Sequence, residues 1–252
     1  MNFPFYIEIG GTKILLHAVL EPLGMFIGFR YFLFLRKKNG DAIESGQRIW
    51  ILIGAIFGAL AGSRILGGFE DPAALFHTPN PLLYIYQNKT VVGGFLGGLA
   101  GVELIKKMIG EKHSSGDLFT YPMLMALIIG RAGCFGMGVH EETYGIVTGF
   151  FTGMNLGDGV YRHPVTLYEI VFLILLWISM KQLEKKHSLA EGGRFKIFMI
   201  MYLFFRLLLD FIKPHYTFNI GLSTIQIACL FGLIYYAPFI FRPKKLILSA
   251  DA

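Results

Sequence analysis

Charged residues and cysteines are scarce in this sequence. Only 16% of the 252 residues are charged, whereas 54% are hydrophobic, and the mean hydropathy is +0.56. This balance excludes an ordinary soluble domain and predicts one integral membrane domain over residues 1–252. With only Cys134 and Cys229, a disulfide framework or a cluster of several thiolates around a metal is not expected.

The sequence also lacks local signatures of nucleotide or metal binding. It has no Walker loop, no dinucleotide-binding fingerprint and no regular metal-ligand spacing, so we expect no cofactor and no metal. Residues 1–13 lack a basic stretch and a small-residue cleavage site, so no removable signal peptide is expected. The net charge of +6 does not predict nucleic-acid binding, because basic loops beside anionic lipid head groups explain it.

What is present is a series of long apolar runs. We expect an all-α polytopic protein with about seven transmembrane helices, because an open chain in lipid satisfies its backbone groups only as a helix. The expected spans are 14–35, 49–67, 91–109, 118–138, 165–180, 195–212 and 222–241. Segment 69–89 contains Pro72, Pro79 and Pro81 and should lie along the membrane surface instead.

Basic residues follow alternate spans. They are Arg36 to Lys38, Lys106 and Lys107, Lys185 and Lys186, and Lys244 and Lys245. Positive loops stay in the cytoplasm, so the N-terminus is expected outside and the C-terminus in the cytoplasm. Segments 128–169 and 206–226 then supply polar groups to the outer face.

A polar site is expected there, because charge beside hydrocarbon is costly and usually functional. Arg131 and Arg206 are the candidate phosphate ligands, since a guanidinium can hold two phosphate oxygens. His163 is the candidate base, and Glu169 is expected to orient an arginine rather than to act as base. Further candidates at the outer ends of the spans are His17, Glu21, Arg64, Gly93, Gly94, Arg162, Tyr168, Asp210, Lys213 and Gln226.

Simpler interpretations stay open. The charges could be interfacial anchors, and Arg206 could form an intrahelical ion pair with Asp210, since Arg206, Asp210 and Lys213 fall on one helical stripe. His140, Glu21 and Glu169 are alternative bases, His17 shares a helical face with Glu21, and His163 could merely begin a helix. Small residues spaced by four in the third span allow either close helix packing or the approach of a lipid to the backbone.

Several short motifs recur in a fixed order along nearly the whole chain. They are His17, Gly62-Ser63-Arg64, Gly93-Gly94-Phe95-Leu96-Gly97-Gly98, Gly116-Asp117, Gly130-Arg131-Ala132-Gly133-Cys134-Phe135, Arg162-His163-Pro164, Leu167-Tyr168-Glu169, Arg206 with Asp210 and Lys213-Pro214, and Gln226. In this order they resemble the prolipoprotein diacylglyceryl transferase family.

The resemblance implies a seven-helix enzyme of the bacterial cytoplasmic (inner) membrane. Such an enzyme moves a diacylglyceryl group from phosphatidylglycerol to the lipobox cysteine in the signal peptide of a prolipoprotein and releases glycerol phosphate. The nucleophilic sulfur belongs to the acceptor, so Cys134 is expected to be a packed residue. The resemblance implies no cofactor and no nucleic-acid partner.

The sequence departs from the family pattern at several positions. Val92 stands where the family has a histidine, and Val19 where it has a tyrosine. Asp210 and Lys213 replace a glutamate and an arginine, and the loop after Cys134 is longer. Two other functions therefore stay open: a related membrane transferase with another acceptor, and a non-catalytic lipid-binding or transport protein.

Overall fold

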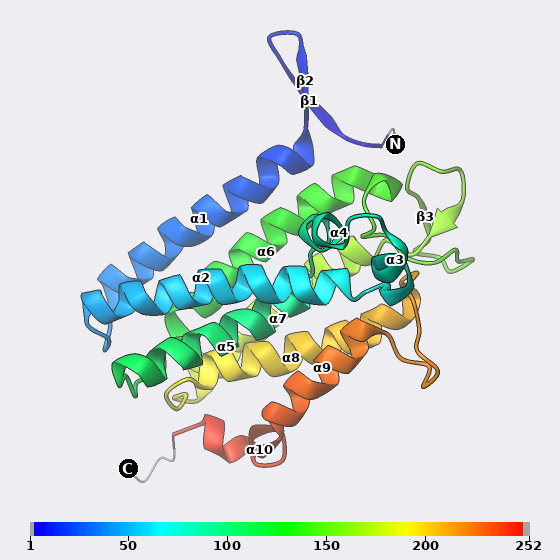
Figure 1. Ribbon diagram of the computed structural model, residues 1–252. Helices are drawn as coiled ribbons and strands as arrows, with labels where there is room; N and C mark the ends of the chain where they lie inside the picture. Colours follow the sequence, from blue (N-terminus) through cyan, green and yellow to red (C-terminus); the bar gives the residue numbers. More distant parts are fainter. Residues whose placement is uncertain (1–2, 249–252) are drawn as a thin grey trace.

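The computed structural model describes residues 3–248, which form a bundle of helices (Figure 1). The main helices are α1 (Leu16–Asn39), α2 (Ser45–Gly68), α5 (Val91–Ile109), α6 (Asp117–Met137), α7 (Val165–Lys186), α8 (Gly193–Leu209) and α9 (Thr224–Tyr235). Short helices are α3 (Pro72–His77), α4 (Pro81–Gln87) and α10 (Ala237–Ile240), and 3-10 turns are η1 (Gly138–His140), η2 (Asp210–Ile212) and η3 (Pro243–Leu246). Helices α1 and α6 pack along each other, as do α2 and α5.

The surface of the bundle suits a membrane. Four segments are long and apolar enough to cross a bilayer, namely α1, α2, α7 and the unit Asp117–His140 that joins α6 to η1. Large apolar side chains such as Phe26, Phe57 and Phe231 point outward, as lipid-facing residues do. The prediction of a predominantly helical membrane protein is confirmed, whereas the count of seven spans and the orientation remain predictions.

Each of the first six expected spans corresponds to one main helix with small differences at the ends, whereas the last span does not. Segment 222–241 was predicted as one helix, and this is wrong: α9 ends at Tyr235, and α10 has only four residues. The break lies at Tyr236, whose φ of −89° and ψ of 1° depart from helical values, and Pro238 then stands in the first turn of α10, where its missing backbone N–H costs no hydrogen bond. The twelve residues of α9 are only about 18 Å long at 1.5 Å per residue.

A β-hairpin precedes α1 and was not predicted. Strand β1 (Tyr6–Ile9) pairs antiparallel with β2 (Thr12–Leu15), and the hairpin projects from the end of the bundle (Figure 1). Gly10 and Gly11 form its turn with φ angles of +58° and +81°, which glycine adopts without strain. Residues 14 and 15, expected in the first span, belong to β2 instead.

Glycines bring α2 and α5 into close contact. A Cβ on Gly93 would meet the carbonyl oxygen of Gly62, and one on Gly97 would meet that of Gly58. Gly98 lies on a neighbouring face of α5, where the nearest atom to such a Cβ would be 3.5 Å away. The structure therefore supports the packing interpretation of these glycines.

The two ends of the bundle differ in character. One end carries the β-hairpin, α3, α4, and the pair β3 (Met154–Asn155) and β4 (Tyr161–Arg162), while the α1–α2 turn, the end of α5 and α10 lie at the other (Figure 1). The basic residues in the last turns of α1, α5 and α7 all belong to this second end. There Asp117 accepts hydrogen bonds from the backbone N–H groups of Gly192 (2.7 Å) and Phe195 (3.0 Å), joining α6 to the start of α8.

Candidate active site

Two arginines and one glutamate meet inside the bundle near its hairpin end. Glu169 of α7 is 1% exposed, and its Oε2 lies 2.9 Å from Arg131 Nε of α6 and 3.2 Å from Arg206 Nη1 of α8. Tyr202 donates a 2.6 Å hydrogen bond from its hydroxyl to the other carboxylate oxygen. We call Arg131, Glu169 and Arg206 the arginine–glutamate triad.

Helix geometry explains how the triad assembles. Arg131 and Arg206 lie in the last two turns of α6 and α8, and Glu169 lies in the second turn of α7. Since α7 runs opposite to the other two helices, all three side chains reach the same depth. Tyr202 stands four residues before Arg206 and shares its helical face, so it reaches the same carboxylate.

The charge of the triad does not cancel. Two guanidinium groups oppose one carboxylate, which leaves a formal charge of +1 (2 − 1) at a buried position. A buried net charge is costly unless a counterion compensates it. The triad is therefore suited to an anion that carries a single negative charge.

Unused donors point to the same conclusion. Arg206 Nε is buried and has no hydrogen-bond partner among the described residues. Arg131 Nε lies at ion-pair distance from Glu169, yet it makes no aligned hydrogen bond within residues 3–248. The attraction to Glu169 persists because an ion pair depends weakly on angle, whereas the Nε–H group stays free to donate because a hydrogen bond depends strongly on angle.

Asp210 does not pair with Arg206. The alternative of an intrahelical ion pair is wrong for the described residues: Arg206 turns to Glu169, while Asp210 accepts a hydrogen bond from the Ser223 hydroxyl and lies 3.8 Å from His215 Nδ1. The predicted stripe also breaks, because α8 ends at Leu209, Asp210 begins η2, and Lys213 is extended at φ −101° and ψ 146°. Pro214 causes this, since it disfavours the helical conformation in the residue before it.

Gln226 has a structural contact on one side of its amide. Its Oε1 accepts from the backbone N–H of Ser223 at 2.9 Å, and its own backbone N–H donates to Ser223 Oγ at 3.0 Å. This reciprocal pair is a capping box that starts α9. Nε2 of the same side chain is buried without a partner among residues 3–248, so it remains a candidate ligand donor.

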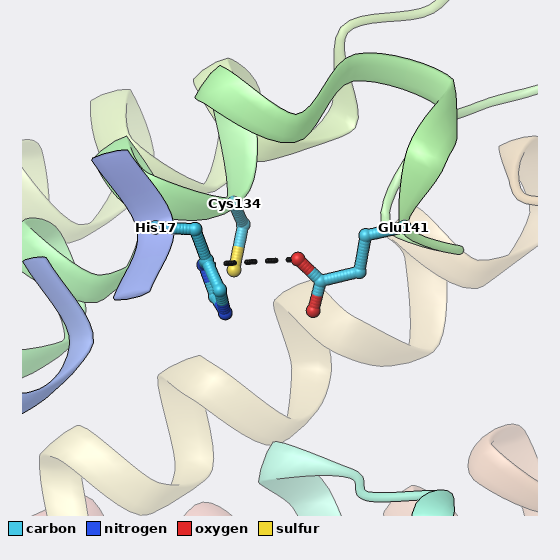
Figure 2. A group of neighbouring side chains, drawn as sticks. All are labelled: His17, Cys134 and Glu141. Carbon is cyan, nitrogen blue, oxygen red and sulfur yellow. Dashed lines mark ion pairs between the residues drawn. The ribbon is translucent and has the colours of Figure 1, made fainter. Parts of the chain in front are cut away.

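A second polar group lies beside the triad. Figure 2 shows His17 at the start of α1, Cys134 near the end of α6 and Glu141 just after η1 pointing toward one another. Their potential ligand atoms all lie within 4.8 Å of one another. Arg131 Nη1 is 3.8 Å from Cys134 Sγ, which links this group to the triad.

The other side of His17 faces an ion pair. His17 Nε2 lies 3.2 Å from Glu21 Oε2, and Lys89 donates to the second oxygen of Glu21 at 2.7 Å. The structure thus brings the predicted residues His17 and Glu21 together, with Lys89 as their partner. It also disagrees with the expectation that Cys134 is merely packed, since its sulfur faces polar atoms.

His163 belongs to a different cluster. Its Nδ1 lies 3.1 Å from the hydroxyl of Tyr168, which forms a further, short hydrogen bond with Thr152. Arg162 donates to Asp158 at 2.7 Å and stacks over Tyr144 at 5.0 Å from the ring centre. Within the described residues no hydrogen bond or ion pair joins His163 or Arg162 to the triad.

The remaining predicted residues lie around these clusters. The guanidinium of Arg64 stacks over Tyr86 of α4 at 5.1 Å. Burial and the positive charge of Arg206 lower the pKa of the Lys213 ammonium below its usual value. Burial raises the pKa of the Glu70 carboxyl, although the nearby charges of Lys213 and Arg206 oppose the shift. Gly93 lines the α2–α5 contact, and Gly94 lies on the adjacent face of α5, with 3.8 Å to the nearest atom.

Sequence reasoning missed Tyr202, Ser223 and the role of Glu141 in these clusters. Tyr202 had a usable signal, because it precedes Arg206 by one helical turn in an otherwise apolar span. Ser223 and Gln226 form the spacing of a capping box, which is also recognisable from sequence. Glu141 had no comparable signal, because His17, its ion-pair partner, is distant in sequence.

Comparison with known proteins identifies the family. The sequence profile described as prolipoprotein diacylglyceryl transferase matches residues 4–242. A phosphatidylglycerol–prolipoprotein diacylglyceryl transferase from Campylobacter hominis is 26% identical over 258 residues, which covers 92% of this chain and 87% of the relative. Proteins of the same name from Campylobacter lari and Dehalococcoides mccartyi are 27% and 24% identical and cover 85% and 96% of this chain and 82% and 94% of themselves. The chain belongs to the prolipoprotein diacylglyceryl transferase family.

Proposed function

We propose that this protein transfers a diacylglyceryl group from phosphatidylglycerol to the lipobox cysteine of a prolipoprotein and releases glycerol phosphate. The relatives carry phosphatidylglycerol and prolipoprotein in their names, and they match nearly the full chain. The observation in this protein that carries the proposal is the arginine–glutamate triad. Its formal charge of +1 complements the single negative charge of a phosphodiester.

In the proposed reaction the acceptor sulfur attacks the glycerol carbon that bears the phosphate. A carbon–sulfur bond forms, the carbon–oxygen bond to phosphate breaks, and glycerol phosphate leaves with the electron pair. Arg131 and Arg206 would hold the phosphate oxygens as this charge develops, and Glu169 would keep both guanidinium groups in position. The protein needs no nucleophile of its own.

An apolar groove supports the lipid part of the proposal. It has a volume of about 510 Å³, and it lies between α2, α5 and α9. Its wall includes Gly62, Gly97 and Ala228, where a missing side chain or a single methyl group leaves room beside the helices. We propose that the groove holds acyl chains of phosphatidylglycerol, which would enter sideways from the bilayer.

The charge of the two ends of the bundle supports one orientation of the protein in the membrane. The triad lies in the half of the bundle opposite to the basic last turns of α1, α5 and α7. Basic ends favour the cytoplasm, so the triad would face the outer leaflet of a bacterial cytoplasmic membrane, with seven spans and the N-terminus outside. A lipobox cysteine emerges at that leaflet.

The acceptor thiol must lose its proton before it attacks. His163, the candidate from sequence, contacts Tyr168, whereas His17 lies within 4.8 Å of Cys134, whose sulfur is 3.8 Å from Arg131 of the triad. The effects of His163→Gln and His17→Gln on the pH profile of transfer would distinguish the two.

The direct test is lipid transfer by the purified protein. We expect vesicles of labelled phosphatidylglycerol to pass the diacylglyceryl group to a lipobox peptide, and not to the same peptide with serine in place of cysteine. Phosphatidylcholine vesicles serve as a control for the donor. Transfer to an amine or hydroxyl acceptor alone, or no transfer by folded protein, would contradict the proposal.

A further inference from the structure

We propose that His17, Cys134 and Glu141 bind a divalent zinc ion, and that the ion holds the thiolate of the acceptor. The first half of the proposal stands on geometry alone. The second half rests on the proposed transferase function.

His17 at the start of α1 meets Cys134 and Glu141, which lie seven residues apart at the end of α6 and just after η1 (Figure 2). Nδ1 of His17 lies 3.7 Å from Oε2 of Glu141, and every ligand pair lies within 4.8 Å. In a tetrahedral zinc site with bonds of about 2.0–2.3 Å, ligand atoms stand about 3.3–3.8 Å apart. The His17–Glu141 pair already meets this distance, and small side-chain rotations would bring Cys134 Sγ to it.

Backbone packing favours the arrangement. Gly133, the neighbour of Cys134, faces α1 so closely that a Cβ there would lie 3.2 Å from His17 Cα and 3.3 Å from His17 Nδ1. The missing side chain lets the imidazole approach the end of α6. The position of the sulfur relative to the ring is therefore set by two packed helices rather than by a loop.

Two of the ligand atoms have no other partner. His17 Nδ1 and Glu141 Oε2 are both buried, and neither makes a hydrogen bond within the described residues. Their separation of 3.7 Å is too long for a hydrogen bond between them. Buried polar atoms are usually satisfied, so a shared ligand between them explains both at once.

The opposite side of the imidazole matches a metal ligand as well. Nε2 of His17 lies 3.2 Å from Glu21, whose other oxygen accepts from Lys89. A carboxylate on the far nitrogen fixes the tautomer and makes the near nitrogen a better ligand, as in carboxylate–histidine–zinc arrangements. With Nε2 donating to Glu21, the lone pair of Nδ1 points toward Cys134 and Glu141.

The ligand types select zinc. One nitrogen, one sulfur and one carboxylate oxygen suit a borderline ion, whereas calcium and magnesium prefer oxygen alone. A cysteine thiolate and a glutamate carboxylate would neutralise the two positive charges of the ion, and Arg131 Nη1 lies 3.8 Å from Cys134 Sγ. Three protein ligands leave the fourth position open, which is typical of catalytic sites.

The open position would bind the acceptor cysteine. Coordination converts its thiol to a thiolate, and the proton passes to water. The coordinated sulfur then attacks the glycerol carbon, the carbon–oxygen bond breaks, and the triad next to Cys134 receives the leaving phosphate. His17 would act as a ligand in this scheme, and not as a base.

Metal content tests the site without any lipid substrate. Protein purified from zinc-supplemented medium and dialysed should retain about one zinc per chain by elemental analysis. The zinc content of Cys134→Ser and of Glu141→Gln should each be at least tenfold lower. Cobalt reconstitution should give a sulfur-to-cobalt charge-transfer absorption that Cys134→Ser abolishes. Cys229→Ala is the matched control, because this thiol is buried outside the cluster and should change neither signal.

The outcomes separate the two halves. Folded wild-type protein without stoichiometric zinc, or a cobalt spectrum that survives Cys134→Ser, would overturn the metal site. If zinc binds but its removal by a chelator leaves transfer to the lipobox peptide unchanged, the thiolate role is overturned and the site stands. If zinc binds and no lipid transfer occurs even with added zinc, the proposed transferase function fails while the site again stands.

Discussion

Among single residues, Glu169 decides how the two arginines are arranged. It is buried, it contacts both Arg131 and Arg206, and Tyr202 anchors its second oxygen. A single arginine paired with Glu169 would have given a neutral ion pair between two helices. The glutamate instead holds two cations close together, which explains why an excess positive charge persists in an apolar bundle.

Replacing Glu169 by glutamine should destabilise the fold. The substitution keeps the shape and leaves two buried guanidinium groups uncompensated, a loss of about 3–5 kcal/mol for a broken buried pair. Thermal unfolding in detergent measures it. Glu103→Gln is the control. Glu103 is half exposed and lies 3.5 Å from Lys106, and such a surface ion pair contributes at most about 1 kcal/mol to stability. Equal melting temperatures for Glu169→Gln and wild type would contradict this reading of the triad.

Arg131 is the residue that transfer should depend on most. Arg131→Ala removes a donor to the developing phosphate charge, a loss typically worth about 10²–10³ in rate. Arg131→Lys should recover little, because one ammonium cannot supply a two-pronged contact. Arg242→Ala, an exposed arginine after α10, is the control and should retain wild-type rates. A folded Arg131→Ala protein with unchanged transfer would remove Arg131 from the site.

At the level of elements, α2 and α5 depend on glycine for their close approach. The pairs Gly62 with Gly93 and Gly58 with Gly97 leave no space for a methyl group between the backbones. The same contact forms part of the wall of the apolar groove, through Gly62, Gly93 and Gly97. Helix packing and groove shape are therefore coupled.

Two neighbouring glycines of α5 should respond differently to alanine. A Cβ at position 97 would meet the carbonyl of Gly58, so Gly97→Ala should force the helices apart. The free energy of unfolding should fall by about 1–3 kcal/mol. Gly98→Ala is the matched control, since its Cβ would lie 3.5 Å from the nearest atom. Melting temperature in detergent and lipid transfer measure both effects. Similar losses for the two variants would indicate that helix propensity, and not packing, decides.

Which elements could be predicted follows from their local signals. Six spans agreed with helices because long apolar runs in lipid have one stable conformation. The β-hairpin was missed because it is short, and an adjacent apolar run suggested an earlier helix start. The split of the last span at Tyr236 was missed because the apolar composition continues across it; Pro238, in the first turn of α10, is a typical helix-start signal that was not used.

The candidate site was less predictable than the fold. The residues of the triad were named from sequence, but the choice of Glu169 over Asp210 as partner of Arg206 depends on how α7 and α8 face each other. Cys134 and Glu141 are only seven residues apart, but the approach of His17 to them had no local signal, because it comes from a distant part of the chain. Tertiary packing alone brings them together.

For the whole molecule, the charge difference between its ends makes a test of orientation possible. A cysteine introduced at Asp158, in the β3–β4 region, should react with an impermeant thiol reagent added to intact cells. One introduced at Ser188, after the basic end of α7, should react only after permeabilisation. Wild type serves as the blank for its own cysteines. The reverse pattern would place the triad at the cytoplasmic leaflet.

The short helix α9 has a consequence for the surrounding membrane. Helices α1 and α2 have 24 residues each, whereas α9 has 12, about 18 Å against a hydrocarbon thickness of about 30 Å. Such a hydrophobic mismatch is relieved when nearby lipid thins. Because α9 also forms a wall of the groove, thinning there would lower a lipid phosphate toward the depth of the triad. We expect transfer in vesicles to be faster with fourteen-carbon than with twenty-two-carbon surrounding lipids at equal phosphatidylglycerol content, and a rate independent of chain length would show that the bilayer does not deform beside α9.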